Sequence, residues 1–200
     1  KKIAFRETFR LNVTSFSVCY RTFLLFLPVF VLVDELDRLI MHFFPMPAEW
    51  LESLNDLVQF TSLPDAVLLL FISSIIAPVA EELLFRGLVQ RSLEIFREPA
   101  IAMVLTSVLF AVAHFNPWTG IQLLILGMVL GYITYLSQSV IPAIFFHGLN
   151  NFFSMILMNA DATQIGWYES GGHVQWYWIV AAALAVFPAF QYFRKSIRHF

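Results

Sequence analysis

Charged residues are scarce in this chain of 200 residues: Asp, Glu, Lys and Arg together make up only 13% of it. A soluble globular domain contains about 25% charged residues, so the composition argues against an ordinary soluble domain and against a disordered segment. The formal net charge is −2. With no basic excess to neutralise phosphates, we expect no nucleic-acid partner.

Cysteine is almost absent as well. Cys19 is the single cysteine of the sequence, so no disulfide can form within the chain and no Cys-x-x-Cys motif occurs. What the sequence has in abundance is apolar residues, at 59%. The length fits a single domain, and we expect one membrane-embedded domain over residues 1–200. In lipid this length suffices for about six spanning helices, because each needs about 20 apolar residues.

Long apolar runs predict where the chain crosses the membrane. None of them shows the alternation of barrel strands, which are about 10 residues long, so the predicted fold is all-α, a polytopic membrane helix bundle. The second run is expected to form one long helix with a kink at Pro78. The six predicted spans cover residues 16–33, 66–97, 99–115, 120–137, 140–158 and 176–193.

Positive charge gathers at alternate ends of these spans. The N-terminal region resembles a signal peptide, but no small-x-small cleavage site follows it, so we expect it to remain as an anchor. Cations mark the cytoplasmic side, which predicts an integral protein of a prokaryotic plasma (inner) membrane with both termini in the cytoplasm. The ten cations on that side are Lys1, Lys2, Arg6, Arg10, Arg86, Arg91, Arg97, Arg194, Lys195 and Arg198.

The opposite side is predicted to be acidic, to hold all five tryptophans, and to include a long loop over residues 34–65. Apolar residues recur at helical spacing within this loop, opposite acidic ones, which predicts an amphipathic helix. Two arrangements stay open: the helix lies on the outer membrane surface, or it packs against the bundle. The apolar residues are Trp50, Leu51, Leu54, Leu57 and Val58, and the acidic ones are Glu49, Glu52 and Asp56.

Ionisable residues interrupt the second span, where each costs about 2.5–3.5 kcal/mol at a helix centre and marks function by default. The run Glu-Glu-Leu-Leu-Phe-Arg occupies residues 81–86. Glu82 and Arg86 are four residues apart with the acid first, which is the favourable order for a helical ion pair. Glu81 points about 100° away around the helix, so it is left for another partner. The plainer alternative is a helix end whose charges are solvated.

Two further polar pairs lie in later spans, at Phe110–His114 and at His147–Asn151. Glu81 and His114 are 33 residues apart. If the chain turns back near residue 98, each lies about 16 residues, or about 24 Å, from the turn, so the two reach the same depth. A lone histidine in a span is more often structural, but two histidines and a glutamate on three helices favour a common site.

This set of side chains can hydrolyse an amide without a covalent intermediate. Glu81 with His114 can hold and deprotonate a water, since a carboxylate in a low-dielectric cavity is a better base near neutrality. His147 and Asn151 can donate hydrogen bonds to the oxyanion of a tetrahedral intermediate. No cofactor is required. A serine mechanism has little support, because no serine of the spans has an obvious paired base in the sequence.

Other functions use the same residue types. Two histidines and a carboxylate can ligate zinc in an open catalytic site, so a zinc-dependent protease is one alternative, although the His-Glu-x-x-His pair is absent. Buried Glu and His also serve ion pathways, but no inverted repeat typical of transporters is evident. A non-catalytic immunity or binding protein on the same scaffold is the third alternative.

The ordered set Glu-Glu-x-x-x-Arg, Phe-x-x-x-His and His-x-x-x-Asn resembles the CPBP family of intramembrane proteases, also called ABI, which includes the type II CAAX prenyl proteases. The likeness covers residues 66–158, the predicted protease core. It implies a glutamate-dependent intramembrane endopeptidase whose partners are membrane lipid and a protein or peptide substrate, lipidated or not. Prenyl proteases typically have eight spans, whereas this chain is more compact, and other members act in immunity, sorting or maturation.

The resemblance also implies a role for each motif residue. Glu81 and His114 correspond to the water-activating pair, and His147 and Asn151 correspond to the oxyanion-stabilising pair. Glu82 and Arg86 correspond to the supporting residues.

Overall fold

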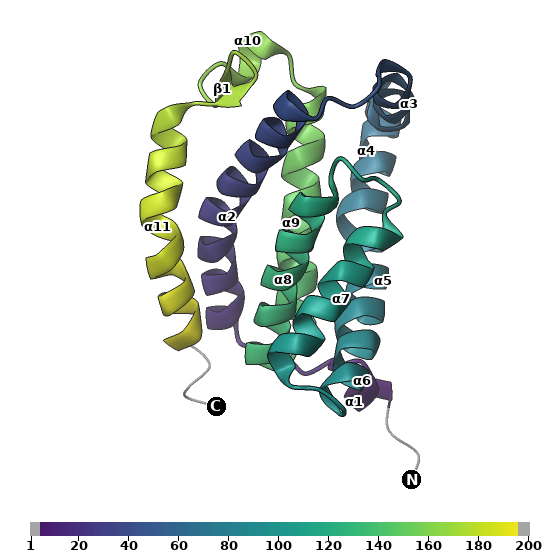
Figure 1. Cartoon of the computed structure of the whole chain (residues 1–200), viewed down its shortest axis with the longest axis vertical. Coiled ribbons are helices and arrows are strands. Elements are labelled where there is room, and N and C mark those ends of the chain that lie inside the picture. Colours follow the sequence, from purple (N-terminus) through teal and green to yellow (C-terminus); the bar gives the residue numbers. More distant parts are fainter. Residues whose placement is uncertain (1–4, 196–200) are drawn as a thin grey trace.

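The computed structural model describes residues 5–195, which form a bundle of long helices with one short β-hairpin (Figure 1). Lys1, Lys2 and Arg198, three of the cations predicted to face the cytoplasm, lie outside the described residues. The elements in chain order are α1 (Phe5–Thr8), α2 (Phe16–Phe43), α3 (Ala48–Val58), α4 (Leu63–Phe71), η1 (Ile72–Ile76), α5 (Ala77–Glu82), η2 (Leu83–Gln90), α6 (Arg91–Glu94), α7 (Pro99–Ala113), α8 (Gly120–Ser137), α9 (Ile141–Asn159), α10 (Ala162–Ile165), β1 (Glu169–Ser170), β2 (His173–Val174) and α11 (Trp176–Lys195).

Five helical segments within the described range are long and apolar enough to cross a membrane. Helix α7 is also apolar but has only 15 residues. The predicted all-α polytopic membrane bundle is confirmed, with five long candidate spans and one shorter apolar helix, α7, at the place of the third predicted span. The candidate spans are α2, the continuous helix Leu63–Glu94, α8, α9 and α11.

The first span corrects the predicted loop boundary. Helix α2 continues to Phe43, so residues 34–43 are helical and the outer connection is shorter than the predicted 34–65. The reason is that the charged end of α2 has partners distant in sequence. Glu35 accepts hydrogen bonds from the backbone N–H of Val174, at 2.8 Å, and from His173 Nδ1, at 2.9 Å. Arg38 pairs with Glu169 at 2.6 Å.

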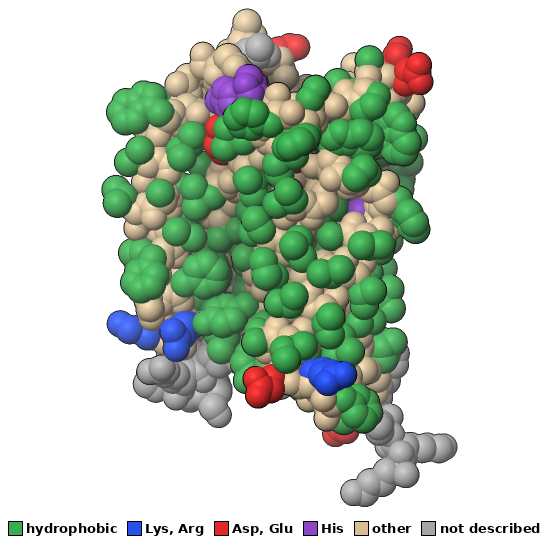
Figure 2. All heavy atoms as spheres, viewed as in Figure 1, with side chains coloured by type: hydrophobic (Ala, Val, Ile, Leu, Met, Phe, Trp, Pro, Cys, Tyr) green, Lys and Arg blue, Asp and Glu red, His purple; other side chains and the backbone are tan. Residues whose placement is uncertain are grey.

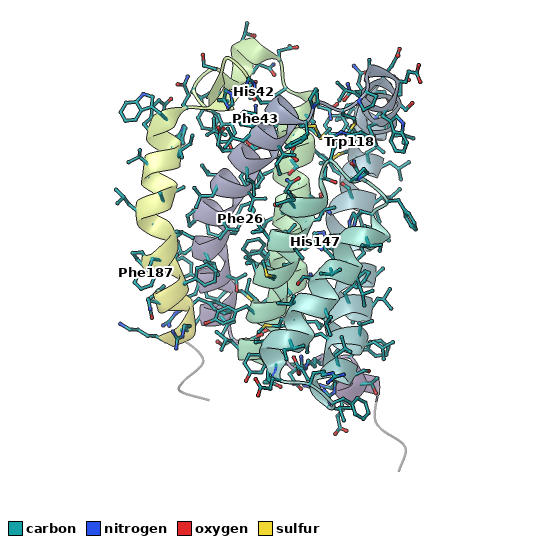
Figure 3. The ribbon with its side chains drawn as sticks, viewed as in Figure 1. Phe26, His42, Phe43, Trp118, His147 and Phe187 are labelled. Carbon is teal, nitrogen blue, oxygen red and sulfur yellow. The ribbon has the colours of Figure 1, made fainter. Side chains whose placement is uncertain are left out.

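The predicted amphipathic helix is present as α3, and every one of its residues is at least partly exposed. Its exposure favours the surface arrangement over packing into the bundle. Trp50 on α3 contacts Trp118 in the connection between α7 and α8, with ring centroids 5.6 Å apart. Trp118 accordingly lies just beneath α3 in Figure 3.

The predicted long second helix is confirmed as Leu63–Glu94, but it is not a regular α-helix. Two of its segments, η1 and η2, are wound as π-helix with i→i+5 hydrogen bonds. Pro78 lies two residues after the end of η1, where its missing N–H interrupts the α-helical hydrogen-bond pattern. Stretches of π-helix are rare and are often found at functional sites.

The hydrophobic core lies where α2, α8 and α9 meet, with α11 packed against the outer side of α2. Phe26 of α2 contacts Phe146 of α9 edge to face, with centroids 5.4 Å apart, and Figure 3 shows it pointing between these helices. Phe187 of α11 points outward and is 69% exposed, as a lipid-facing residue would be.

The two ends of the bundle differ. Helix α1 and the end of α11 lie at one end, whereas α3, α10 and the hairpin lie at the other (Figure 1). On the face shown in Figure 2, the blue Lys and Arg side chains appear only near the first of these ends, and broad apolar surface covers the middle. This arrangement agrees with the predicted charge asymmetry, while the compartment that each end faces stays a prediction.

Candidate active site

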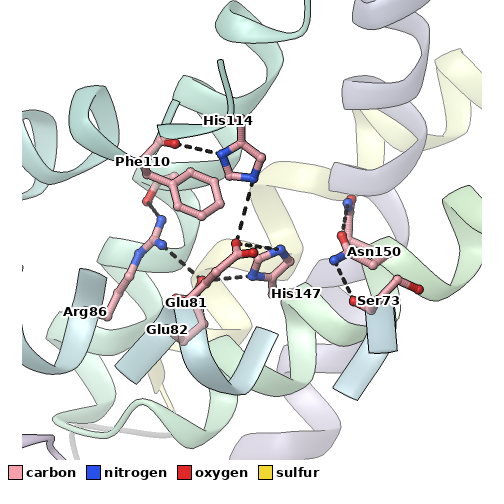
Figure 4. A network of polar contacts seen from close by, with 10 residues as sticks. Ser73, Glu81, Glu82, Arg86, Phe110, His114, His147 and Asn150 are labelled. Atoms are coloured by element: carbon pink, nitrogen blue, oxygen red, sulfur yellow. Dashed lines mark hydrogen bonds and ion pairs between the residues drawn. The ribbon is translucent and has the colours of Figure 1, made fainter. Parts of the chain in front are cut away.

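Three polar side chains from three different helices converge near the middle of the bundle (Figure 4). The Oε2 atom of Glu81 lies 3.7 Å from Nε2 of His114 and 3.9 Å from Nε2 of His147. Glu81 lies in α5, His114 is the residue that ends α7, and His147 lies in α9. The hairpin geometry inferred from the spacing of Glu81 and His114 is therefore observed. The two side chains are about equally accessible, at 31% and 30% exposed, whereas that of His147 is buried.

His114 is held by its own helix. Its Nδ1 lies 2.8 Å from the backbone oxygen of Phe110, one turn earlier. A carbonyl oxygen can only accept, so Nδ1 carries the proton and Nε2, the atom facing Glu81, is free to accept one. The Phe110 ring packs against both imidazoles, with centroids 4.7 Å from His114 and 5.7 Å from His147. The Phe-x-x-x-His motif therefore fixes both the tautomer and one apolar wall of the site.

Glu82 is fully buried and orients His147. Its Oε1 accepts a hydrogen bond from His147 Nδ1 at 2.9 Å and another from Arg86 Nη1 at 3.0 Å. The predicted Glu82–Arg86 pair is confirmed, and it does more than neutralise a charge. Because His147 Nδ1 donates to Glu82, the Nε2 atom of His147 is turned toward Glu81.

The guanidinium of Arg86 is held from more than one helix, although its Nε atom has no hydrogen-bond partner. Its Nη2 donates to the backbone oxygen of Gly127 at 3.1 Å, and its guanidinium lies 4.3 Å from the centroid of the Phe110 ring. A buried cation needs such partners, since the charge has lost its water. These contacts connect the second and fourth spans directly behind the site.

Asn151 lies on α9 one turn after His147, as predicted, but its amide is already engaged. Its Nδ2 donates to the backbone oxygen of Ser73 at 2.9 Å. The Ser73 oxygen is available because the N–H of Ala77 bonds to Ile72 in the π-helical pattern, and Pro78, the next donor in that pattern, has no N–H. Asn151 thus joins α9 to the motif helix, and this contact uses one of the two hydrogens of its amide.

Gly148 is a residue of the site that the sequence reasoning missed. A Cβ built on it would lie 2.5 Å from the backbone oxygen of Ser74, so no larger residue fits without a backbone shift. Its position allows α9 to approach η1 closely enough for His147 and Asn151 to reach their partners. A glycine inside an apolar helix, next to a polar motif, is the available sequence signal.

The serines and possible metal ligands give two further findings. Ser107 donates to the backbone oxygen of Met103 at 2.7 Å, and the hydroxyls of Ser73 and Ser74 lie 3.5 Å from each other. Among residues 5–195, no group of three or more His, Cys, Asp or Glu side chains is arranged to hold a metal ion.

The comparison with protein families gives one match. Residues 63–153 match the family described as type II CAAX prenyl endopeptidase Rce1-like. No curated protein and no solved structure matches the chain significantly. The matched segment begins with α4 and ends within α9, and so includes the Glu81, His114 and His147 that the fold brings together. The resemblance drawn from the motifs is confirmed over this segment, which matches an Rce1-like, CAAX-protease-type family, and the long apolar helices are those of an integral membrane protein.

Proposed function

We propose that this protein is an intramembrane endopeptidase that hydrolyses peptide bonds of membrane-associated proteins or peptides with a water activated by Glu81 and His114. The observation that carries the proposal is the position of Glu81 Oε2, between the imidazoles of His114 and His147 at 3.7 and 3.9 Å. These gaps are too long for direct hydrogen bonds. A water can occupy the region facing all three groups and donate to a carboxylate and an unprotonated imidazole nitrogen.

In the proposed reaction, Glu81 takes one proton from this water while the oxygen attacks the carbonyl carbon of the scissile amide. The unprotonated Nε2 of His114 accepts the second hydrogen of the water as a hydrogen bond and so aims its lone pair. The carbonyl π electrons move to the oxygen, which becomes an oxyanion. Collapse of the intermediate breaks the C–N bond, and Glu81 returns its proton to the leaving nitrogen. The products are a carboxylic acid and an amine.

His147 and Asn151 are the proposed donors to the oxyanion. His147 Nδ1 donates to Glu82, so its Nε2 donates only when the ring is doubly protonated. The carboxylate of Glu82 stabilises that cation, as a carboxylate behind a histidine does in other hydrolases. The free amide hydrogen of Asn151 is the second donor. This assignment keeps Glu82 and Arg86 as supporting residues and requires no metal.

The first experiment measures cleavage of membrane peptides by the purified protein in liposomes. Glu81→Gln and His114→Ala are each expected to lower turnover by about 10²–10⁴-fold, the contribution of a positioned general base. Glu49→Gln, which removes an exposed carboxylate on α3, is the matched control and should cleave like the wild type. Cleavage retained by both site variants would overturn the proposal.

The second experiment addresses zinc. The proposed mechanism predicts that turnover survives strong chelation once detergent effects are corrected. Loss of turnover that zinc alone restores would favour the zinc-dependent alternative. Proton or solute flux that depends on Glu81 in the same liposomes, without cleavage, would instead identify a transporter.

The substrate and its location are also proposed from family resemblance and charge pattern. We expect a membrane-associated protein or peptide, lipidated or not, in a prokaryotic inner membrane. Peptides that accumulate in a strain carrying Glu81→Ala, identified by mass spectrometry of the membrane fraction, would give the substrate directly.

A further inference from the structure

The polar residues of the motif helix do not end at Arg86. Gln90 and Glu94 continue the same spacing of four residues from Glu82, and neither takes part in the proposed reaction. Glu82, Arg86 and Gln90 are all fully buried, and the side chain of Glu94 is only 11% exposed. Four polar side chains thus form a buried row that extends from the site toward the end of the bundle that holds α1.

The winding of η2 affects the direction of this row. In an α-helix, with about 3.6 residues per turn, residues four apart advance around the axis by about 40° beyond a full turn. A π-helix holds more residues per turn, so residues four apart fall short of a full turn, and a π-helical segment within an α-helix offsets part of this drift. Leu83–Gln90 is wound in this way. The π-helical segment therefore keeps Arg86 and Gln90 on the side of the helix that faces α8.

Helix α8 offers a matching row of backbone oxygens. Arg86 donates to the oxygen of Gly127 at 3.1 Å, and Gln90 Nε2 donates to the oxygen of Gly131 at 3.1 Å. Both acceptors are glycines, again four residues apart. A Cβ on Gly131 would lie 2.9 Å from Gln90 Oε1. A larger residue at position 131 would therefore require the end of the Gln90 side chain to shift.

The lower end of the row reaches back to the helix that carries His147. Gln90 Nε2 also donates to Glu94 Oε1 at 2.9 Å, and Glu94 forms an ion pair with Arg10. The backbone oxygen of Arg10 in turn accepts from the N–H of Val140, just before α9, at 3.1 Å. Gln90 thus lies between two connections to α9. Toward the site, Arg86 and Glu82 lead to His147. Toward the end of the bundle that holds α1, Glu94 and Arg10 lead to the start of α9.

We propose that Gln90 is a positioning residue for the hydrolytic reaction, a role that rests on the proposed function. It holds η2 in register with the edge of α8 formed by Gly127 and Gly131, so that Arg86 keeps Glu82 where it can orient His147. Gln90 does not touch the reacting atoms. Its effect reaches the site through Arg86 and Glu82, which contact His147 or a residue that contacts it.

The decisive variant is Gln90→Met, which keeps the length of the side chain and removes both hydrogen bonds. It is expected to lower kcat about tenfold in liposomes and to leave KM within about twofold, because the substrate does not meet Gln90. Thr134→Val is the matched control. It removes a buried hydroxyl of α8 that has no hydrogen-bond partner, so kcat should not change.

A second variant separates positioning from loss of folding. Gly131→Ala displaces the Gln90 amide from the opposite helix, while alanine favours a helix more than glycine does. We expect its melting temperature in detergent to equal or exceed that of the wild type while kcat falls as in Gln90→Met. Because both changes break the same contact, the double variant should lose little more than either single one. Full kcat in both single variants, or additive losses, would overturn the proposal.

A readout that needs no cleavage distinguishes this proposal from the proposed function. The ¹⁵N resonances of His147, assigned with His147→Gln, report whether Nδ1 carries the proton that Glu82 accepts. We expect Gln90→Met to shift them and Thr134→Val not to. If the wild-type protein cleaves no peptide but this shift occurs, the proposed function fails and the positioning role stands. If the wild type cleaves and the resonances do not move, the positioning role is wrong.

Discussion

The bundle holds two clusters of acidic residues, and they are built differently. At the end with the hairpin, both oxygens of Glu35 have donors within hydrogen-bond distance, His173 at 2.9 Å and the N–H of Val174 at 2.8 Å. In the middle of the bundle, the nearest ring nitrogens to Oε2 of Glu81 lie at 3.7 and 3.9 Å, and this oxygen has no hydrogen-bond partner. Both oxygens of the Glu35 carboxylate accept hydrogen bonds from the protein, whereas Oε2 of Glu81 is open to a partner from outside the protein.

The difference teaches how a structural carboxylate can be told from a reactive one. Within the site itself, Glu82 differs from Glu81 in a related way, since Oε1 of Glu82 accepts from both Arg86 and His147, although its Oε2 has no hydrogen-bond partner. These neighbours in sequence have different partners because the helix turns them in different directions. The hydrogen bonds that a carboxylate accepts from the protein therefore distinguish one that is held in place from one that is left open.

The largest effect should appear in turnover when the two kinds of carboxylate are compared directly. Glu81→Gln is expected to lower peptide turnover at least about 100-fold, since it removes the base, and Glu35→Gln should stay within a few-fold of wild type. Both substitutions keep the shape of the side chain. Turnover by the two variants in the same liposome assay checks this, and a larger loss for Glu35→Gln would break the comparison.

The next largest effect concerns stability, measured as the loss of unfolding free energy when the arginine of each cluster is removed. Arg86→Met leaves Glu82 charged and buried without its cation, which should cost about 3–5 kcal/mol of unfolding free energy. Arg38→Met, at the hairpin end, should cost less, because the Arg38 side chain is 19% exposed and water can replace part of what it loses. Unfolding in detergent by a denaturing titration measures both. Equal losses would contradict the distinction between the two clusters.

The smallest expected effect concerns Tyr168, whose hydroxyl donates to Asp34 at 2.8 Å. Burial, together with the nearby Asp34 carboxylate, raises the pKa of Tyr168. The hydrogen bond should therefore stabilise the fold fully below the ordinary tyrosine pKa of about 10 and be lost only as the pH rises through the raised value. Tyr168→Phe should cost about 0.5–1.5 kcal/mol at neutral pH without affecting turnover.

The pH dependence can be measured by ultraviolet absorbance. The tyrosinate signal of the wild type minus that of Tyr168→Phe is expected to show no titration near pH 10 while the protein stays folded. A step of one tyrosine at that pH would show that the hydroxyl is not held as described.

The sequence was sufficient to predict that Glu81 and His114 converge, because the rise per residue of a helix is fixed and the turn near residue 98 sets the depth of both side chains. It was also sufficient for the ion pair of Glu82 and Arg86, which depends on contacts within one turn. These features follow from local geometry and from the expense of placing charge in lipid. The catalytic role of the residues stays a prediction until turnover is measured.

What the sequence could not give depends on partners distant in the chain or on unusual backbone winding. The charges in residues 34–43 suggested a loop, because Glu35 and Arg38 meet their partners more than 130 residues later. The π-helical winding of η1 and η2 has no known pattern of residues, so the contacts of Asn151 and Gln90 could not be foreseen. Gly148 and Gly131 were visible only as small residues within apolar spans.

One consequence follows from Pro78, which lies two residues beyond the first π-helical segment. Pro78 lacks an amide hydrogen, and that vacancy in the ladder turns an intrahelical acceptor, the oxygen of Ser73, into an attachment point for a neighbouring helix through Asn151. A substitution that made this helix more regular would satisfy the acceptor locally and detach its neighbour. Here a defect within one helix is the means by which two helices recognise each other in a solvent that offers them no hydrophobic attraction.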